Sequence, residues 1–323
     1  MDLRFLGRAG VKVTPICLGN MNFGRPDSCD EQLSRRIMER AVEAGINFFD
    51  TANVYQKQES ERILGRWLKD GGAQRRDALV IATKVYGKAG STENDRGLSR
   101  FHIVKACEDS LQRLQTDRID LYQCHHWDFV PIEETIRAMD DLIRAGKVLY
   151  WGTSNFKAWH LTEAALKAER MLAPVPVSEQ CPYSMTNRHV ETELAPFCMK
   201  FGVRMLPWSP LNGGRLSGAY RKGQKIPDTP RNRGEEWRKT LDKNLDLIEA
   251  LAKLAGELGR PLSHFAYAFL YAQPHVASVI IGPRTVEHLD ESIAALDLKI
   301  PEEVLKKIDA LVPPGSAPDF IGW

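Results

Sequence analysis

Four side chains suited to proton transfer come at or just after the ends of three successive apolar segments of the sequence. Asp50 ends the second apolar segment and Tyr55 follows it, whereas Lys84 and His125 end the third and fourth. A cation beside a buried phenol favours the phenolate and lowers the pKa of the phenol. We therefore expect Lys84 to lower the pKa of Tyr55, so that the phenol can donate a proton near neutral pH. Asp50 would keep Lys84 charged, and His125 would hydrogen-bond a substrate oxygen and stabilise its developing charge.

Each of these four residues also has a structural explanation. Asp50 could cap the following turn, Tyr55 could be a loop aromatic, and Lys84 could be a solvated charge at a strand end. His126 directly follows His125, and the sequence leaves open which imidazole faces the site. The combination of four such residue types on neighbouring segments favours a catalytic group. The sequence contains no HExxH motif, Walker loop or Ser-His-Asp order that would compete for the site.

The elements that must position these residues alternate along the whole chain. Short apolar segments are separated by stretches of helical periodicity, at roughly 30 to 40 residues per unit, as in a (β/α)8 barrel. Segments 79–82 and 278–281 are apolar at consecutive positions, which is typical of parallel strands covered on both faces. The expected strands end near Gly19, Asp50, Lys84, His125, Gly152, Gln180, Trp208 and Ile281. Helices are expected over 31–44, 59–69, 99–115, 132–145, 158–170 and 188–200.

We thus predict an α/β protein, a single (β/α)8 barrel (TIM barrel) domain over residues 1–323. A doubly wound dinucleotide-binding sheet is disfavoured because residues 19–24 read Gly-Asn-Met-Asn-Phe-Gly and not GxGxxG. Active sites of such barrels lie at the carboxyl ends of the strands, so the four reactive residues would share one rim. Departures from the repeat are a β-hairpin over 3–14, a long loop after the seventh strand, helices over 240–258 and 262–272, and an extra C-terminal helix over 301–311.

Composition excludes several classes of partner. The chain has 43% apolar and 27% charged residues and a net charge of +2, which gives no reason to expect nucleic acid. No apolar stretch approaches the roughly 18 residues of a membrane span. Asp2 and Arg4 interrupt any secretory signal, and six cysteines lack CxxC spacing, which indicates free thiols and neither disulfides nor a metal site. A cytoplasmic protein without membrane insertion is expected.

Three segments resemble signature segments of the aldo-keto reductase superfamily. They are Gly-Ile-Asn-Phe-Phe-Asp-Thr-Ala-Asn-Val-Tyr at 45–55, Asp-Leu-Tyr-Gln-Cys-His at 120–125 and Tyr-Trp-Gly-Thr-Ser-Asn at 150–155. The resemblance covers essentially the whole chain. It is nearest to bacterial reductases and potassium-channel β-subunits, through residues 131–135 and 150–154 together with 208–211. It implies an NADPH-dependent oxidoreductase that reduces aldehydes or ketones. Asp50, Tyr55, Lys84 and His125 would form the catalytic tetrad, with Tyr55 as general acid.

The same resemblance implies a cofactor site for NADP(H). Ser154, Asn155 and Gln180 would bind the nicotinamide carboxamide and Trp208 would stack on the ring. The loop after the seventh strand, with Arg215, Arg221 and Lys222, would cover the pyrophosphate. Arg284 matches the ligand of the 2′-phosphate, which favours NADP(H) over NAD(H), while His288 and Ser292 depart from the residues usual in relatives. The expected cofactor-binding set is Gly19, Met21, Asp50, Ser154, Asn155, Gln180, Trp208, Ser209, Pro210, Leu211, Arg215, Gly282, Arg284, His288, Glu291 and Ser292.

The substrate side is expected to be aromatic. Phe23, Tyr86 and Trp127 follow the first, third and fourth strands, and Trp323 could fold over the opening from the tail. A small-molecule carbonyl compound is therefore the expected partner, while the sequence identifies neither the substrate, the direction of the reaction nor the oligomeric state. Two other functions remain open: an NADPH-binding accessory subunit resembling the channel β-subunits, and a metal-dependent hydrolase or aldolase at the same rim. His125, His126 and Asp128 are the residues that a metal would use.

Overall fold

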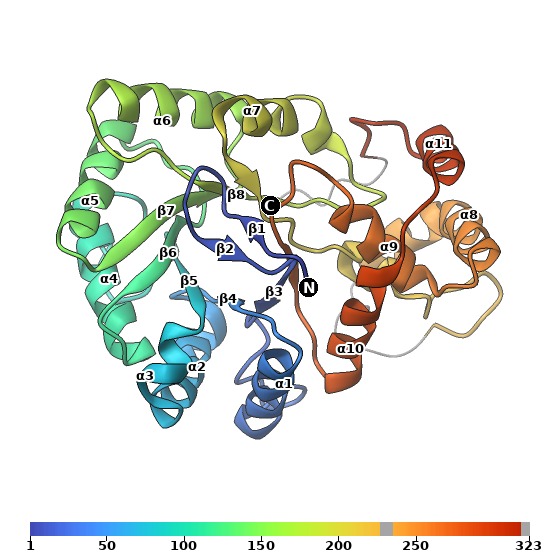
Figure 1. Cartoon of the computed structure of the whole chain (residues 1–323), viewed down its shortest axis with the longest axis horizontal. Helices are drawn as coiled ribbons and strands as arrows, with labels where there is room; N and C mark the ends of the chain where they lie inside the picture. The colour runs from blue at the N-terminus through green and yellow to red at the C-terminus, as the bar shows by residue number, and fades with distance from the viewer. Residues whose placement is uncertain (227–234, 318–323) are drawn as a thin grey trace.

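The computed structural model describes residues 1–226 and 235–317, and within them eight parallel strands form the central sheet (Figure 1). In sequence order the strands are β3 (Ile16–Gly19), β4 (Phe48–Asp50), β5 (Val80–Val85), β6 (Ile119–Cys124), β7 (Val148–Ser154), β8 (Ser178–Gln180), β9 (Arg204–Met205) and β10 (Val279–Ile281). In space they follow this order, with β10 beside β3. Backbone hydrogen bonds from Ala277 to Met205 (3.0 Å) and from Ile280 to Pro207 (2.8 Å) join the last two strand segments. The predicted (β/α)8 fold is confirmed.

Strand residues alternate between two apolar clusters. Phe48, Ala82 and Leu121 belong to a cluster inside the barrel, whereas their neighbours, such as Phe49 and Tyr122, pack in the larger cluster under the helices. Side chains two residues apart in a strand share a face. The residues two positions further along, Asp50, Lys84 and Gln123, therefore point inward at the carboxyl ends of β4, β5 and β6.

A two-stranded hairpin closes the amino-terminal end of the barrel. Strands β1 (Arg4–Phe5) and β2 (Lys12–Val13) pair antiparallel, as predicted, and Figure 1 shows them lying across the barrel. Leu6, at the turn, packs with the interior cluster. Gly7 has φ +62°, and a Cβ there would lie 2.0 Å from the carbonyl oxygen of Val177, so this close approach requires glycine.

Helices surround the sheet in Figure 1. They are α1 (Glu31–Glu43), α2 (Glu59–Asp70), α3 (Gly72–Asp77), α4 (Arg100–Leu114), α5 (Ile132–Arg144), α6 (Ala158–Arg170), α7 (Leu194–Phe201), α8 (Glu235–Glu257), α9 (Leu262–Tyr271), α10 (Val286–Ala294) and α11 (Glu302–Leu311). The short helix α3 was not predicted. None of the helices in the described ranges is long and apolar enough to cross a bilayer. All six cysteines are buried and free.

The predicted helix over 188–200 is wrong in its first half. A short 3-10 turn, η2 (His189–Glu191), comes first, and α7 begins only at Leu194. Pro196 explains the break, because proline lacks an N–H and clashes with the carbonyl four residues earlier, so it is tolerated only in the first turn of a helix. The structure accordingly starts α7 two residues before Pro196.

Candidate active site

The interior ends of β4 and β5 bring an acid and an amine into direct contact. Lys84 is fully buried, and its Nζ donates to Asp50 Oδ1 (2.5 Å), to the carbonyl of Thr51 (2.8 Å) and to the hydroxyl of Tyr55 (3.1 Å). An ammonium has three N–H donors, and all three are used. Lys84 thus has one fixed position, with the phenol of Tyr55 as one of its three partners.

Tyr55 is aimed by a strained turn. The three residues after it, Gln56, Lys57 and Gln58, all have positive φ, at 48°, 53° and 76°. Each left-handed residue costs roughly 1–2 kcal/mol, so such a run needs external support. Two side chains supply it: Gln56 Nε2 donates to the carbonyl of Met21 (2.9 Å) and Gln58 Nε2 to the carbonyl of Ala89 (2.7 Å). The turn that carries Tyr55 is therefore tied to the loops after β3 and β5.

The expected lowering of the Tyr55 pKa is wrong in sign. Burial raises the pKa of Tyr55; the charge of Lys84 offsets only part of this effect, and Asp50 adds to it. Lys84 has only a small effect on the pKa of Tyr55, because Asp50 lies 2.5 Å from its ammonium and cancels much of the field of that charge at the phenol. Burial is the largest single influence on the pKa of Lys84 and acts to lower it, but the charges and hydrogen bonds of Asp50 and Tyr55 together outweigh it, and the net shift is upward. The cluster at neutral pH is therefore a protonated phenol beside a charged ammonium.

The two adjacent histidines have different surroundings. The ring of His125 lies edge-on to the ring of Tyr55, with centroids 5.7 Å apart. Burial, and then Lys84 and His126, lower the pKa of His125 to about 3, so its imidazole is neutral at physiological pH. His126 instead lies against Tyr86 (5.4 Å between centroids), and its Nδ1 is 3.0 Å from the carbonyl oxygen of Trp127. Of the two, His125 is the one beside the phenol.

Sequence reasoning missed Gln123, a fully buried amide on β6. Its Nε2 donates to Asp50 Oδ2 (2.8 Å), and its Oε1 accepts from Gln180 Nε2 (3.0 Å). Gln180 Nε2 also donates to Asp50 Oδ2 (3.0 Å). Strand alternation was the available signal, since Gln123 is a polar residue on the face shared by Leu121. The network links the Asp50–Lys84 pair to an expected cofactor residue.

The residues expected at the nicotinamide gather where β7, β8 and β9 end. Asn155 has φ +60°, and its Nδ2 donates to the carbonyl of His125 and to Ser154 Oγ, both at 3.1 Å. Trp208 Nε1 in turn donates to Asn155 Oδ1 (3.3 Å). On the outer face of β8, the buried carboxyl of Glu179 accepts from Thr153 Oγ1 (2.5 Å) and from the backbone N–H of Phe156 (3.0 Å). This carboxyl holds the turn on which Asn155 stands.

The cationic side chains of the loop after β9 contact other residues of the protein. It begins with Ser209 (φ +58°), Pro210 and Leu211 and continues as the 3-10 turn η3 (Asn212–Ser217). Arg215 is buried, and its guanidinium lies 5.0 Å from the ring centroid of Trp237 on α8. The other two expected cations are also paired with α8. Arg221 contacts Glu249 (2.6 and 2.9 Å) and Lys222 contacts Asp246 (2.8 Å).

The segment between β10 and α10 carries the expected phosphate ligand. Gly282 and Arg284 precede α10, whose first turn is capped by Thr285 Oγ1, which accepts from the backbone N–H of His288 (3.3 Å). No group in the described ranges accepts a hydrogen bond or ion pair from the Arg284 side chain. His288 and Glu291 are exposed, whereas Ser292 is buried and donates to the carbonyl of Leu289 (2.7 Å). Ser292 thus faces the protein interior, and Arg284 remains available to a ligand.

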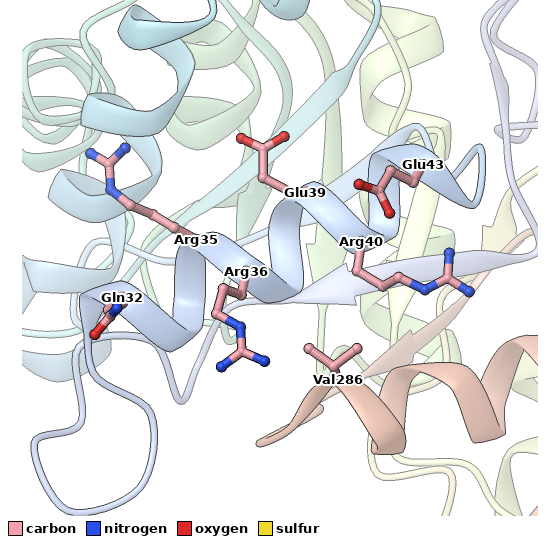
Figure 2. A pocket seen from close by; sticks show the side chains of 7 residues that line it. All are labelled: Gln32, Arg35, Arg36, Glu39, Arg40, Glu43 and Val286. Atoms are coloured by element: carbon pink, nitrogen blue, oxygen red, sulfur yellow. The ribbon is translucent and has the colours of Figure 1, made fainter.

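A shallow groove beside this segment separates α1 from the start of α10. Figure 2 shows Arg36 of α1 pointing toward the side of Val286, and Glu39 pointing away from it. Arg35 pairs with Glu31 and Asp70, and Arg40 pairs with Asp290. Two of the three arginines in the groove are thus neutralised by carboxylates. Gln32 and Glu43 complete its lining.

A second hollow, of about 380 Å³, lies at the carboxyl rim between the loops after β6, β7 and β8. His126, Trp127 and Asn155 line it, and Trp127 stacks on His160 with ring centroids 4.5 Å apart. Tyr86 is half-buried beside His126, whereas Phe23 is completely buried in the core under the helices. Trp323 lies outside the described residues. Of the three expected substrate-side aromatics, Tyr86 and Trp127 are thus partly exposed at the rim.

Two further expected cofactor residues lie at the end of β3, the first strand of the barrel. Gly19 ends β3, and a Cβ there would lie 2.8 Å from the carbonyl oxygen of Ile281, so the approach of β10 excludes a side chain. Met21 is exposed just beyond it. Across the described ranges, no group of three or more His, Cys, Asp or Glu side chains is placed to hold a metal ion. Asp128 instead accepts from the backbone N–H of Leu98 (2.9 Å).

Comparison with known proteins identifies the family. Residues 15–313 match the model of the "Aldo/keto reductase family". The "Uncharacterized oxidoreductase YrpG" of Bacillus subtilis is 40% identical over the full length of both chains. The "Probable voltage-gated potassium channel subunit beta" of Oryza sativa is 37% identical over 97% of each chain, and a "Putative voltage-gated potassium channel subunit beta" of Schizosaccharomyces pombe is 34% identical over 97% of this chain and 93% of its own. The chain therefore belongs to the aldo/keto reductase family.

Proposed function

We propose that the protein is an NADPH-dependent reductase of aldehydes or ketones in which Tyr55 is the general acid. The observation that carries this proposal is the buried chain from Asp50 through Lys84 to the Tyr55 hydroxyl, with contacts of 2.5 and 3.1 Å. A phenol that is protonated at neutral pH and bonded to an ammonium can release its proton to a carbonyl oxygen and leave a stabilised phenolate. The oxidoreductase named among the relatives supports the same class.

The residues present fit NADP(H) at both ends. Toward the nicotinamide, Gln180 Oε1 receives no hydrogen bond from any described group, and Ser154, Asn155 and Trp208 lie nearby. Toward the phosphates, Arg284 lies just before α10 with no partner among the described residues, suited to a bidentate phosphate contact that NAD(H) lacks. Bound NADPH would supply the hydride. Gly19, Met21, Ser209, Pro210, Leu211, Arg215, Gly282, His288, Glu291 and Ser292 remain proposed parts of the same site.

The chain's own residues account for the proton and for the charge. Tyr55 Oη gives its proton to the substrate oxygen, and Lys84 Nζ, 3.1 Å away, stabilises the phenolate that remains. Asp50 keeps the ammonium charged in a buried site. His125 is neutral because its pKa lies near 3, so one ring nitrogen carries a proton that it can share with the same substrate oxygen.

A small carbonyl compound with an apolar body suits the opening best. Tyr86 and Trp127 offer ring surface at the rim, and aromatic walls favour apolar and aromatic ligands. Phe23 acts beneath the site through packing. We also place the protein in the cytoplasm, because its six free thiols suit a reducing compartment.

The test is NADPH oxidation by the purified protein with a panel of aldehydes and ketones, with Tyr55→Phe as the matched variant. The phenylalanine keeps the ring and removes only the proton donor. We expect kcat to fall by about 10²–10⁴, the usual contribution of general acid catalysis, while NADPH binding persists. If the Tyr55→Phe variant oxidises NADPH with every substrate that the wild type uses, or if the wild type uses none, the assignment of Tyr55 fails.

A second function is favoured by the relatives described as potassium channel subunits. In that case the chain would bind NADPH and regulate a partner protein, with carbonyl reduction secondary or absent. Tight NADPH binding by the wild type together with no turnover of any carbonyl in the panel would support this function over the reductase.

A further inference from the structure

Gln123 lies where a polar side chain carries a cost. It is the second-last residue of the six-residue strand β6, every residue of which is buried, and its own side chain is fully buried. Burying an amide without partners costs several kcal/mol on the scale of transfer to an apolar solvent, so its hydrogen bonds decide whether it can be tolerated. Both ends of its amide are used: the NH2 group donates to Asp50, and the oxygen accepts from Gln180.

The orientation of the Gln123 and Gln180 amides follows from the chemistry of Asp50. A carboxylate only accepts hydrogen bonds, so the groups that meet Asp50 Oδ2 must be the NH2 groups of Gln123 (2.8 Å) and Gln180 (3.0 Å). The oxygen of Gln123 then receives the second N–H of Gln180 (3.0 Å). Gln180 is held at two points, and its own oxygen is left without a donor in the part of the chain described by the structure.

We propose that Gln123 is a positioning residue that fixes the Gln180 amide, so that Gln180 Oε1 accepts from the NH2 group of the nicotinamide carboxamide. This inference rests on the proposed use of NADP(H). Asp50 alone would hold Gln180 at a single point about which its amide can pivot, and Gln123 supplies the second point. The same carboxylate oxygen that anchors both amides belongs to the residue that charges Lys84, so cofactor orientation and the proton donor share one support.

The inference predicts a loss of discrimination between two oxidised cofactors. NADP+ has the carboxamide NH2, whereas its 3-acetylpyridine analogue has a methyl group there and cannot donate to Gln180. Dissociation constants of both would be measured by calorimetry with the full-length protein, without a substrate. For the wild type we expect NADP+ to bind about tenfold more tightly than the analogue, the scale of one buried hydrogen bond. For Gln123→Leu we expect weaker NADP+ binding and a preference of less than about threefold.

Two further variants separate positioning from packing. Gln123→Glu places a carboxyl against Asp50 Oδ2, where repulsion from the Asp50 carboxylate keeps it protonated and its O–H takes over the donation to Asp50. Its other oxygen still accepts from Gln180, so the preference for NADP+ should stay near the wild-type value. Tyr122→Phe changes the neighbouring residue on the opposite face of β6, where the hydroxyl is buried without a partner among the described residues. It should leave the preference unchanged. If Gln123→Leu does not fold, Gln123→Met, which keeps the length of the side chain without its polar atoms, replaces it in the same measurement.

The outcomes distinguish the two proposals. Equal preference for NADP+ in the wild type and in the leucine or methionine variant would overturn the role of Gln123 and leave the reductase proposal standing. Loss of the preference in Gln123→Glu and Tyr122→Phe as well would show a general packing defect and would also overturn it. Failure of the wild type to bind NADP+ would overturn the proposed function and this inference with it.

Discussion

The rim above β4, β5 and β6 and the segment after β9 and β10 hold their charged groups in opposite ways. At the first, Lys84 has less than 1% of its side chain exposed and three protein partners within 3.1 Å. At the second, Arg221 and Lys222 pair with carboxylates on α8 at exposures of 36% and 67%, and Arg284 has no partner among the described residues. Among the described residues the charges of the first region are paired, and in the second region we propose that Arg284 takes an added anion.

The difference has an energetic meaning. A buried ion pair is expensive to break, because the remaining charge stays desolvated, whereas exposed pairs contribute little. The proposed catalytic end should therefore be rigid before any ligand arrives, and the proposed phosphate end should gain its order from the ligand. Substitutions in the two regions should then differ in whether they reduce stability or affinity.

Lys84→Met should have the largest effect. The variant leaves the Asp50 carboxylate buried without a counter-ion, although Gln123 and Gln180 still donate to it. Breaking such a pair costs about 3–5 kcal/mol. We expect a loss of unfolding free energy on that scale in urea titrations and, with the Tyr55 phenolate unsupported, a fall in kcat of at least about 10².

Lys222→Met is the matched control for this prediction, since it removes the same side chain from an exposed pair with Asp246. Its unfolding midpoint should match the wild type. A Lys84→Met protein as stable as the Lys222→Met protein would contradict the view that the catalytic rim is held by its buried pair.

Arg284→Met should have an intermediate effect, seen in affinity and not in stability. A charge-assisted hydrogen bond is worth about 1.5–3 kcal/mol, so NADPH binding should weaken about 10- to 100-fold. Binding of NADH, which lacks the 2′-phosphate, should change little. Fluorescence titration with both cofactors measures the ratio directly.

Arg221→Met is the control here, because Glu249 already engages its guanidinium with two contacts. Arg221→Met should weaken the binding of NADPH less than Arg284→Met does. Equal weakening of NADPH and NADH by Arg284→Met would remove the proposed contact with the 2′-phosphate, and with it the contrast between the paired and the unpaired cation.

Local patterns were sufficient to predict the barrel and the placement of Asp50 and Lys84. Both end runs of apolar residues, and two-residue periodicity puts them on the face of Phe48 and Ala82. The same periodicity, carried one step beyond β6, puts Gln123 and His125 on the face of Leu121 and would have separated His125 from His126.

Other features depend on contacts that no local pattern contains. The left-handed run after Tyr55 consists of two glutamines and a lysine, residue types with no preference for that conformation, and it is held by the carbonyls of Met21 and Ala89. The pKa of Tyr55 depends on whether burial or Lys84 dominates, which depends in turn on the 2.5 Å contact between Lys84 and Asp50. Both require the folded chain.

The support that Glu179 gives to the turn of Asn155 is testable through the pH dependence of stability. Burial raises the pKa of Glu179 to about 8, although its hydrogen bonds from Thr153 and the backbone of Phe156 act to lower it. The unfolded chain releases this proton near the ordinary pKa of glutamate, about 4.3. Between these two values the folded state binds a proton that the unfolded state does not, so stability is highest below the lower value and is lost as pH rises toward 8.

Glu179→Gln should remove this dependence, because an amide keeps an acceptor for the Phe156 N–H and has no proton to lose. Relative to the wild type, the variant's unfolding free energy should improve by at most about 1.4 kcal/mol per pH unit across the window. Urea unfolding at pH values of about 5, 6, 7 and 8, which span most of that window, measures the difference. Glu303 is an exposed residue of α11, and the unfolding free energy of Glu303→Gln should change with pH as that of the wild type does. If Glu179→Gln showed the same pH dependence as the wild type, the wild-type Glu179 carboxyl would be ionised in the folded protein. The turn of Asn155 would then be held by a charge, as Lys84 and Asp50 are.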